Sequence, residues 1–195
     1  MNISYCIEKL VPNALYNTNQ TSDQEIDEEF YNNIQWLDSR DKPSWYDIKV
    51  EWFNYLKEYK DNEICKIRDE KIAEGIPYTF PDGILGYVQT RDMIDHRNIQ
   101  ANGSAAQTLL MLGQTEQIMY FRDIENEIHV LYPHQMLDMC MFCMAYGQNI
   151  YANSWLHKDA VKSINIIEDD VDTALEQIIN YDIYNNWSNL QQYIE

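Results

Sequence analysis

The chain has 195 residues, of which 45% are hydrophobic, so it can bury the core of one ordinary domain, with or without a small appendage. Its 14 basic and 32 acidic residues give a formal net charge of -18. Phosphate backbones and anionic membrane surfaces repel such a chain, so we expect neither nucleic acid nor a membrane as a partner.

The N-terminal sequence predicts neither export nor membrane anchoring. It lacks the basic start of a signal peptide and reaches an acidic residue at Glu8. No window holds the roughly 20 apolar residues that a membrane-spanning helix needs. We therefore expect a protein made in the cytoplasm, with reduced thiols instead of a disulfide framework. The thiols are Cys6, Cys65, Cys140 and Cys143.

Residues 1–43 are predicted to form an N-terminal leader with a short helix. We interpret the mixed run from Ile3 to Leu10 as a strand. Residues 22–25 have the S-x-x-E pattern of a helix capping box. Apolar side chains then repeat every four residues, which predicts the short amphipathic helix. The repeat consists of Ile26, Phe30 and Ile34.

Residues 44–190 are predicted to form the main domain, which a long helix opens. Ser44 and Asp47 make a second capping box directly after Pro43, and Gly75 is a natural helix stop. The helix is therefore expected from Trp45 to about residue 74, and at 1.5 Å per residue it would be roughly 45 Å long. Because that is long for a compact domain, we expect the helix to protrude or to pack against a partner.

Two β-hairpins are expected after this helix. Pro81-Asp82-Gly83 fits a type I turn followed by a glycine with positive φ. The second hairpin pairs residues 117–122 with residues 127–132. Alternation divides its apolar side chains between two faces. One face carries Ile118, Tyr120, Ile128 and Val130, and the other carries Met119, Phe121 and Leu131.

Three more helices complete the predicted α+β fold, in which the hairpins and helices pack on a Met- and aromatic-rich helical core. One helix follows Thr90 as its cap, and its small residues 103–106 would let another segment approach its backbone closely. Another opens at Pro133. The last is short and is capped by Asp170. The thin apolar face of the first of these helices consists of Ile94, Ala101, Ala105, Leu109 and Leu112.

No group of residues spells out a reaction. Cys140 and Cys143 have the spacing of a redox or zinc half-site, but they lie in an apolar helical run without a second pair, which favours core packing. Asp92 and His96 share a helix face, and a surface ion pair or a polar junction inside the fold explains them better than a catalytic dyad. The acidic residues 168–172 lack the spacing of a calcium loop and fit a helix N-terminus. We expect no catalytic residue, no cofactor and no metal site.

The surplus of 15 Tyr and 5 Trp is explained either by core packing or by a protein-contact surface, where these residues are favoured. We assign part of it to contact. The predicted contact regions are the aromatic end of the long helix and the second hairpin. The predicted contact residues are Trp45, Trp52, Tyr55, Tyr59, Tyr120 and Phe121.

From about Cys65 to Trp187 the chain resembles the domain of unknown function 4376 family, found in tail, tail-fibre and tail-fibre-assembly proteins of tailed bacteriophages. The stretch around Ile34 to Trp45 resembles the leader that precedes this domain in such proteins. Phe121 stands where the family usually has Trp, and Tyr132 replaces the expected Thr cap. The matching residues include Arg68 to Lys71, Gly83 to Val88, Arg97, Asn98, Gln100, Asn102, Asp123, Asn126, Gln135, Met136, Ala152, Trp155, Lys158 and Trp187.

The resemblance implies no activity, because the family has none to transfer. It implies a non-enzymatic structural protein of the phage tail, baseplate or tail-fibre attachment region, located in the virion. Its partners would be other tail or fibre proteins or further copies of itself, with no small-molecule substrate. A tail-fibre assembly chaperone that is absent from the mature virion is one alternative, and an acidic inhibitor of a host defence protein is another.

Overall fold

The computed structural model describes residues 1–18 and 26–187, and it confirms the predicted α+β class. The described residues form six helices and three antiparallel two-stranded hairpins. The predicted capping box at residues 22–25 and the end of the predicted domain at 188–190 lie outside the described residues. No helix in the described ranges is long and apolar enough to cross a membrane.

The chain divides into two compact units. The first consists of Met1–Glu63 with Lys158–Ile183, and the second consists of Ile64–His157 with Tyr184–Glu195. Two of the three boundaries between them fall inside long helices, α3 (Trp45–Ala73) and α5 (Pro133–Ser163), so each of these helices contributes to both units. The predicted division at residue 43 remains a prediction.

The first unit begins with a helix, α1 (Ile3–Leu10), so the predicted strand is wrong. The side chain of Asn2 caps the helix by accepting from the amide of Tyr5 at 3.1 Å. Ile3, Cys6 and Ile7 are all buried, and their spacing of three and four residues is helical. Burial of these three side chains in the core of the first unit favours a helix over a strand for residues 3–10.

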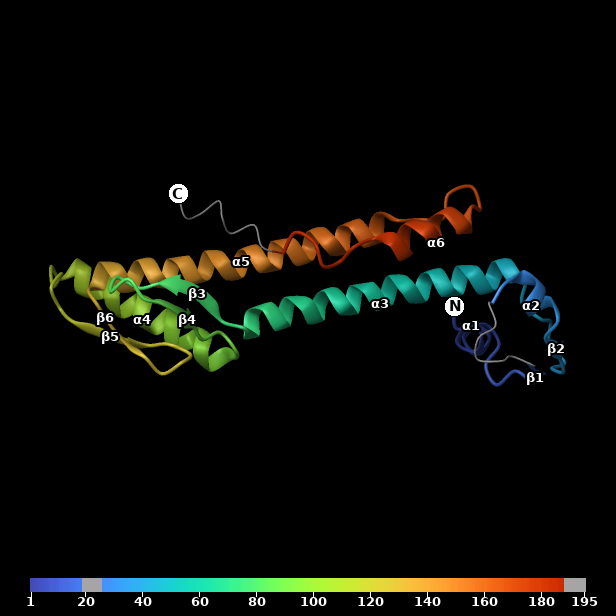
Figure 1. Ribbon diagram of the computed structural model, residues 1–195, viewed down its shortest axis with the longest axis horizontal. Coiled ribbons are helices and arrows are strands. Elements are labelled where there is room, and N and C mark those ends of the chain that lie inside the picture. The colour runs from blue at the N-terminus through green and yellow to red at the C-terminus, as the bar shows by residue number, and fades with distance from the viewer. Residues whose placement is uncertain (19–25, 188–195) are drawn as a thin grey trace. The chain divides into compact units, whose positions relative to one another are not determined.

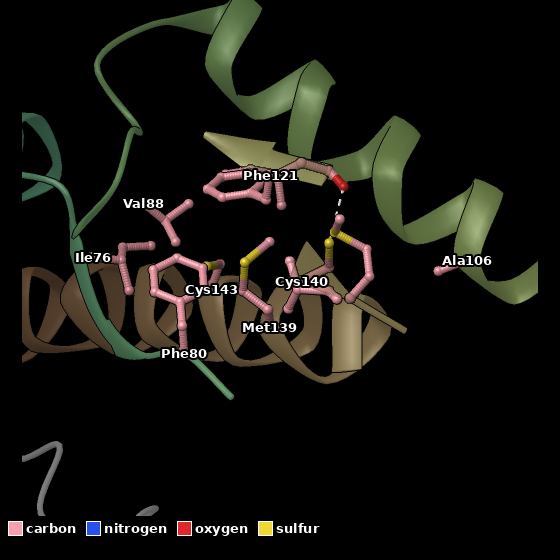
Figure 2. Close-up of a cluster of buried hydrophobic side chains, with 11 residues drawn as sticks. Ile76, Phe80, Val88, Ala106, Phe121, Met139, Cys140 and Cys143 are labelled. Atoms are coloured by element: carbon pink, nitrogen blue, oxygen red, sulfur yellow. Dashed lines mark hydrogen bonds between the residues drawn. The ribbon is translucent and has the colours of Figure 1, made fainter. Parts of the chain in front are cut away.

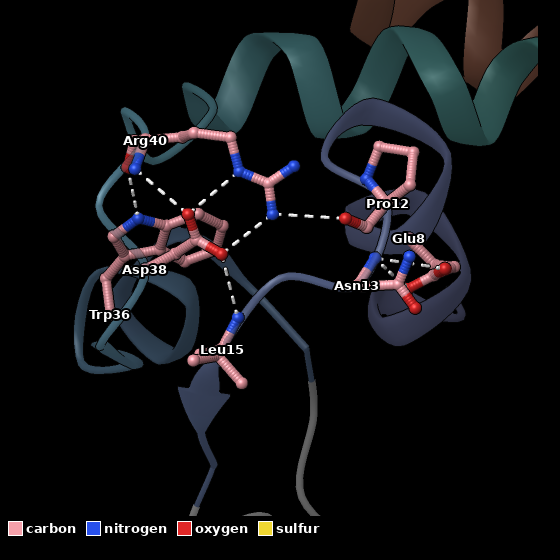
Figure 3. Close-up of polar contacts among 7 residues, drawn as sticks. All are labelled: Glu8, Pro12, Asn13, Leu15, Trp36, Asp38 and Arg40. Atoms are coloured by element: carbon pink, nitrogen blue, oxygen red, sulfur yellow. Dashed lines mark hydrogen bonds and ion pairs between the residues drawn. The ribbon is translucent and has the colours of Figure 1, made fainter.

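A short hairpin, β1 (Tyr16–Asn17) with β2 (Gln35–Trp36), follows and encloses α2 (Glu28–Asn32). Figure 3 shows the polar contacts beside it: Arg40 binds Asp38 at 2.8 Å and donates to the carbonyl of Pro12 at 3.0 Å. Asp38 also accepts from the amide of Leu15 at 3.2 Å. The Arg40 guanidinium holds the pKa of the Asp38 carboxyl well below its usual range. These bonds tie residues 12–15 to residues 36–40.

The first half of α3 is the longest helical segment of the first unit. Its N-terminus has the predicted capping box, because Ser44 Oγ accepts from the Asp47 amide at 3.1 Å and Asp47 accepts from the Ser44 amide at 2.9 Å. Lys57 and Lys60 of α3 donate to carbonyls near the C-terminal ends of α5 and of α6 (Val171–Asn180). Lysine is well suited to these positions, since helix C-termini leave carbonyls unpaired.

In the second unit, two hairpins and α4 (Met93–Met111) lie alongside the first half of α5 (Figure 1). The hairpins are β3 (Ile76–Thr79) with β4 (Leu85–Val88) and β5 (Met119–Arg122) with β6 (Ile128–Leu131). Gly83 has the predicted positive φ, 84°. Figure 2 shows the core that these elements enclose. It contains Ile76, Phe80, Val88, Ile99, Ala106, Phe121, Leu131, Met136, Met139, Cys140 and Cys143.

Two predictions for α4 are wrong. Its cap is Asp92, which accepts from the amides of Ile94 and Asp95, whereas the buried Thr90 donates to the carbonyl of Ile72. Its buried residues are Ile99, Gly103 and Ala106, while the predicted apolar face is largely exposed. The reason is the close approach at Gly103, where a Cβ would lie 3.3 Å from Cys140 Cβ. Of the small residues 103–106, Gly103 and Ala106 are therefore the ones turned into the core, and the approach at Gly103 sets the rotation of the helix.

Candidate contact surface and polar centre of the second unit

The β5–β6 hairpin presents an apolar face to solvent. Tyr120 pairs with Val130 and Arg122 with Ile128, so the side chains of one alternation share this face. It will be called the outer hairpin face. Its four apolar side chains are Ile118, Tyr120, Ile128 and Val130, with exposed fractions of 47%, 67%, 55% and 53%. The predicted division of the hairpin into two faces is confirmed.

The opposite face of the hairpin belongs to the core. Leu131 is fully buried, and Phe121, only 9% exposed, stacks on Phe80 with 5.9 Å between ring centroids. Of the two contact residues predicted in this hairpin, Tyr120 is exposed, whereas Phe121 packs inside the second unit.

The four contact residues predicted on α3 lie in the first unit. Trp45 packs on Tyr31 at 5.5 Å between ring centroids, and Trp52 packs on Tyr55 at 4.8 Å. These rings are half-buried, because they help to close the core formed with α1 and α2. Tyr59 is 48% exposed and is the most accessible of the four. The structure thus gives most of this aromatic group a packing role.

A polar network links the turns of the two hairpins in the second unit. His129 on β6 is 1% exposed, and its Nδ1 lies 2.8 Å from Asp82 Oδ2 in the β3–β4 turn. Its Nε2 lies 3.5 Å from Asp123 Oδ2 in the β5–β6 turn. Asp123 is itself buried and accepts from the amides of Glu125 and Glu127, both at 2.9 Å. The hydrogen bond from His129 is the main reason that the pKa of Asp82 lies below its usual value.

The surroundings of this network leave it no room. Phe80 stacks on the His129 ring with 3.5 Å between centroids and 4° between planes. A Cβ on Gly86 would lie 2.6 Å from Asp123 Oδ2 and 2.9 Å from a Phe80 ring carbon. The amide of Ile124 also donates to the carbonyl of Tyr87 at 2.9 Å. The enclosed imidazole and its two aspartate partners therefore hold the two hairpins together.

Sequence reasoning missed this network. The partners of His129 are distant in the chain, at positions 82 and 123, and no local spacing marks them. The available signal was the alternation in β6, because the inward face that contains Phe121 and Leu131 also contains His129. A histidine on a buried face needs polar partners, and the two nearby turns each supply an aspartate.

The polar half of α4 lines two separate pockets. Asp95, Asn98 and Asn102 lie three and four residues apart and line a polar pocket of about 210 Å³ together with Gln89, Tyr120 and Arg122. His96 and Gln100 lie on the adjacent side of α4 and line a second pocket of about 230 Å³ against α5. Ile99 lies between the two sets and contributes to both pockets.

Cys140 and Cys143 are both buried in the core of the second unit. Cys140 donates to the carbonyl of Ile99 at 3.3 Å, and burial raises the pKa of this thiol to about 11. Burial likewise raises the pKa of Cys143, which lines the same pocket as His96, to about 12. Both groups are therefore neutral thiols near pH 7. In the part of the chain that the structure describes, no three His, Cys, Asp or Glu side chains are placed to hold a metal ion.

In the acidic run at residues 168–172, two of the aspartates have structural roles. Asp170 caps α6 by accepting from the amide of Thr173 at 3.0 Å, as predicted. Asp172 pairs with Lys49 of α3 at 2.7 Å. Asp92 shares a helix face with His96. Its carboxylate caps α4 by accepting from the amides of Ile94 and Asp95.

The profile of one protein family, described as a domain of unknown function (DUF4376), matches residues 55–179. The chain belongs to this family. The DUF4376 match includes both hairpins of the second unit, α4, α5 and most of α6. Comparison with curated proteins and with solved structures finds no match.

All three members of the polar network lie in the DUF4376 region, together with Gly86 and the outer hairpin face. The contact residues predicted at the start of α3, Trp45 and Trp52, precede it. The other predicted contact residues, Tyr55, Tyr59, Tyr120 and Phe121, lie inside it.

Proposed function

We propose that this protein is a non-enzymatic, tail-associated structural protein of a tailed bacteriophage that works by protein–protein contact through the outer hairpin face. The sequence resemblance and the DUF4376 family support the proposal. The observation that carries it is the exposure of four large apolar side chains on a single face, where solubility alone would favour polar residues. The site of action would be the tail, baseplate or fibre attachment region of the virion, after synthesis in the host cytoplasm.

The outer hairpin face has the composition of a contact surface. A tyrosine and three aliphatic side chains occupy its centre, and residues of this kind are typical of the cores of protein interfaces. Exposed acidic residues flank the strands, namely Glu116, Glu125 and Glu127, while the exposed Arg122 lies on the face itself. We therefore expect the partner, another tail or fibre protein, to offer an apolar patch bordered by Lys or Arg.

The packing of the hairpin makes the surface suitable for recognition. The inner side chains, Phe121, His129 and Leu131, are fixed in the core, and Asp123 orders the turn with two backbone hydrogen bonds. A surface held in this way loses little conformational entropy on binding. A two-stranded hairpin also has unpaired strand edges to which a partner strand can bind.

Mass spectrometry and photo-crosslinking on purified phage particles would test the proposal. A photoreactive phenylalanine at position 120 is expected to crosslink to one tail or fibre protein. The same group at position 184 is the matched control, because Tyr184 is 69% exposed and Tyr120 is 67% exposed. The control is expected to give no such product.

Two charge variants define the role of the face. Tyr120→Arg and Val130→Arg should fold normally, since both side chains are more than half exposed, and should reduce incorporation into particles at least ten-fold. Incorporation at the wild-type level would show that the face is not the contact. Absence of the wild-type protein from particles would favour the assembly chaperone, and salt-sensitive capture of a basic host protein would favour the inhibitor.

A further inference from the structure

We infer that the pocket between α4 and α5 binds a small uncharged molecule, one or two fused rings in size, with a single hydrogen-bonding group directed to solvent. This site is independent of the proposed contact function and lies within the second unit. It will be called the α4–α5 pocket. Four isoleucines line it, Ile72, Ile76, Ile99 and Ile150, and will be called its floor; Gly147 and His96 also line the pocket.

The chemistry of the lining defines the ligand. Four isoleucines from α3, β3, α4 and α5 converge on the pocket, and three of them, Ile76, Ile99 and Ile150, are at most 5% exposed. The polar side chains in the lining include Thr90, which is buried and donates to the carbonyl of Ile72, and the exposed His96, Gln100 and Gln148. A largely apolar lining with a few polar groups is typical of small-molecule sites. None of the residues lining this pocket is Asp, Glu, Lys or Arg, so the pocket offers no ion-pair partner to a charged ligand.

The volume limits the size of the ligand. The pocket holds about 230 Å³. An engineered cavity of about 150 Å³ lined by similar side chains binds benzene. The α4–α5 pocket therefore accepts one ring with a short substituent, or a fused pair of rings such as indole.

Gly147 provides an independent observation. It lies inside α5 without a positive φ, where glycine costs roughly 0.5–1 kcal/mol relative to alanine. A Cβ at this position would meet no atom within 4 Å, so packing does not require glycine either. By contrast, a Cβ on Gly103 would press on Cys140 at 3.3 Å. Because residue 147 has no side chain, the space beside it in the α4–α5 pocket stays open.

Indole is the probe for the first test. The full-length protein is labelled with ¹³C at the isoleucine δ1 methyl groups, and indole is titrated while NMR spectra are recorded. We expect a dissociation constant of about 1 mM or lower, with shifts confined to the four isoleucines of the floor. Ile3, Ile7 and Ile48, buried in the first unit, are the internal controls. Absence of saturable shifts, or equal shifts in the control methyls, would overturn the inference.

Charged probes and filled-pocket variants test the site more sharply. Tryptamine and indole-3-acetate keep the ring and add a charge, so each is expected to bind at least ten-fold more weakly than indole. Gly147→Leu should fill the space and weaken indole binding at least ten-fold, whereas Ala145→Leu, on the exposed side of the same helix, should leave it unchanged.

A folding control keeps this result interpretable. Should Gly147→Leu fail to fold, Gly147→Ala replaces it, because the added methyl meets no atom within 4 Å and the substitution suits a helix. Gly147→Ala is expected to remain folded and to weaken indole binding measurably. Unchanged binding in a folded Gly147 variant would show that indole binds elsewhere and would refute the site.

Discussion

His129 and Asp82 are in direct contact, with 2.8 Å between Nδ1 and Oδ2, although 46 residues separate them in the chain. The other ring nitrogen faces Asp123, which is buried in the turn of the second hairpin. One imidazole thus connects the turns of both hairpins. Because the hairpins form two separate two-stranded sheets, this network and the aromatic stack beneath it replace the strand pairing that would otherwise join them.

Replacing His129 by phenylalanine is expected to lower the free energy of unfolding by about 2–4 kcal/mol. The new ring keeps the stack on Phe80 but removes the hydrogen-bonding partner from the buried Asp123 carboxylate. Urea unfolding followed by circular dichroism measures the loss. The matched control is His134→Phe at an exposed site, which should change stability by no more than about 0.5 kcal/mol. Equal stability of the two variants would contradict a structural role for the network.

The network also predicts a pH dependence. The hydrogen bond from His129 lowers the pKa of Asp82 in the folded protein, whereas an unfolded Asp titrates near about 3.9. The stabilisation is therefore fully present above that value and is lost as the pH falls through the lower, folded pKa. Asp82→Asn should show a smaller loss of stability than wild type as the pH drops below about 4. Unfolding curves at a series of acidic pH values measure this difference, and parallel losses in the two proteins would refute the assignment.

Gly86 tests how tightly the network is enclosed. A methyl group there would lie 2.6 Å from an Asp123 oxygen and 2.9 Å from Phe80, so one of them must move. Gly86→Ala is expected to destabilise the protein by about 1–3 kcal/mol, the usual cost of overpacking. Thermal unfolding provides the measurement. A neutral Gly86→Ala variant would mean that the hairpins can separate without cost.

Local rules predicted much of the fold because the deciding interactions are close in sequence. Pro81 to Gly83 predicted a turn, and the turn is present with Gly83 at φ 84°. The reciprocal bonds between Ser44 and Asp47 were readable from a spacing of three residues. Alternation in the second hairpin separated Tyr120 from Phe121 correctly.

The cap of α4 was a local error, but the other errors arise where residues distant in the sequence determine the structure. The first residues form a helix because Ile3, Cys6 and Ile7 meet the core of the first unit, which a weak local pattern does not show. The buried side of α4 follows from the approach of Cys140 to Gly103, 37 positions apart. Side chains from four segments line the α4–α5 pocket, so no local sequence motif could predict it.

Cysteine reactivity provides a final prediction, because burial separates the four thiols into two classes. Cys6, Cys140 and Cys143 are at most 4% exposed, and burial raises their pKa values to about 11, 11 and 12. At pH 8 these groups are almost entirely protonated, and the thiolate is the form that reacts. Cys65 is half-exposed, so iodoacetamide should modify it first in the folded protein. Peptide mass spectrometry at timed intervals measures each site, with a urea-unfolded sample in which all four should react. Modification of Cys143 as fast as Cys65 in the folded protein would show that the core around α5 opens readily, and the packing role assigned to the pair would then be wrong.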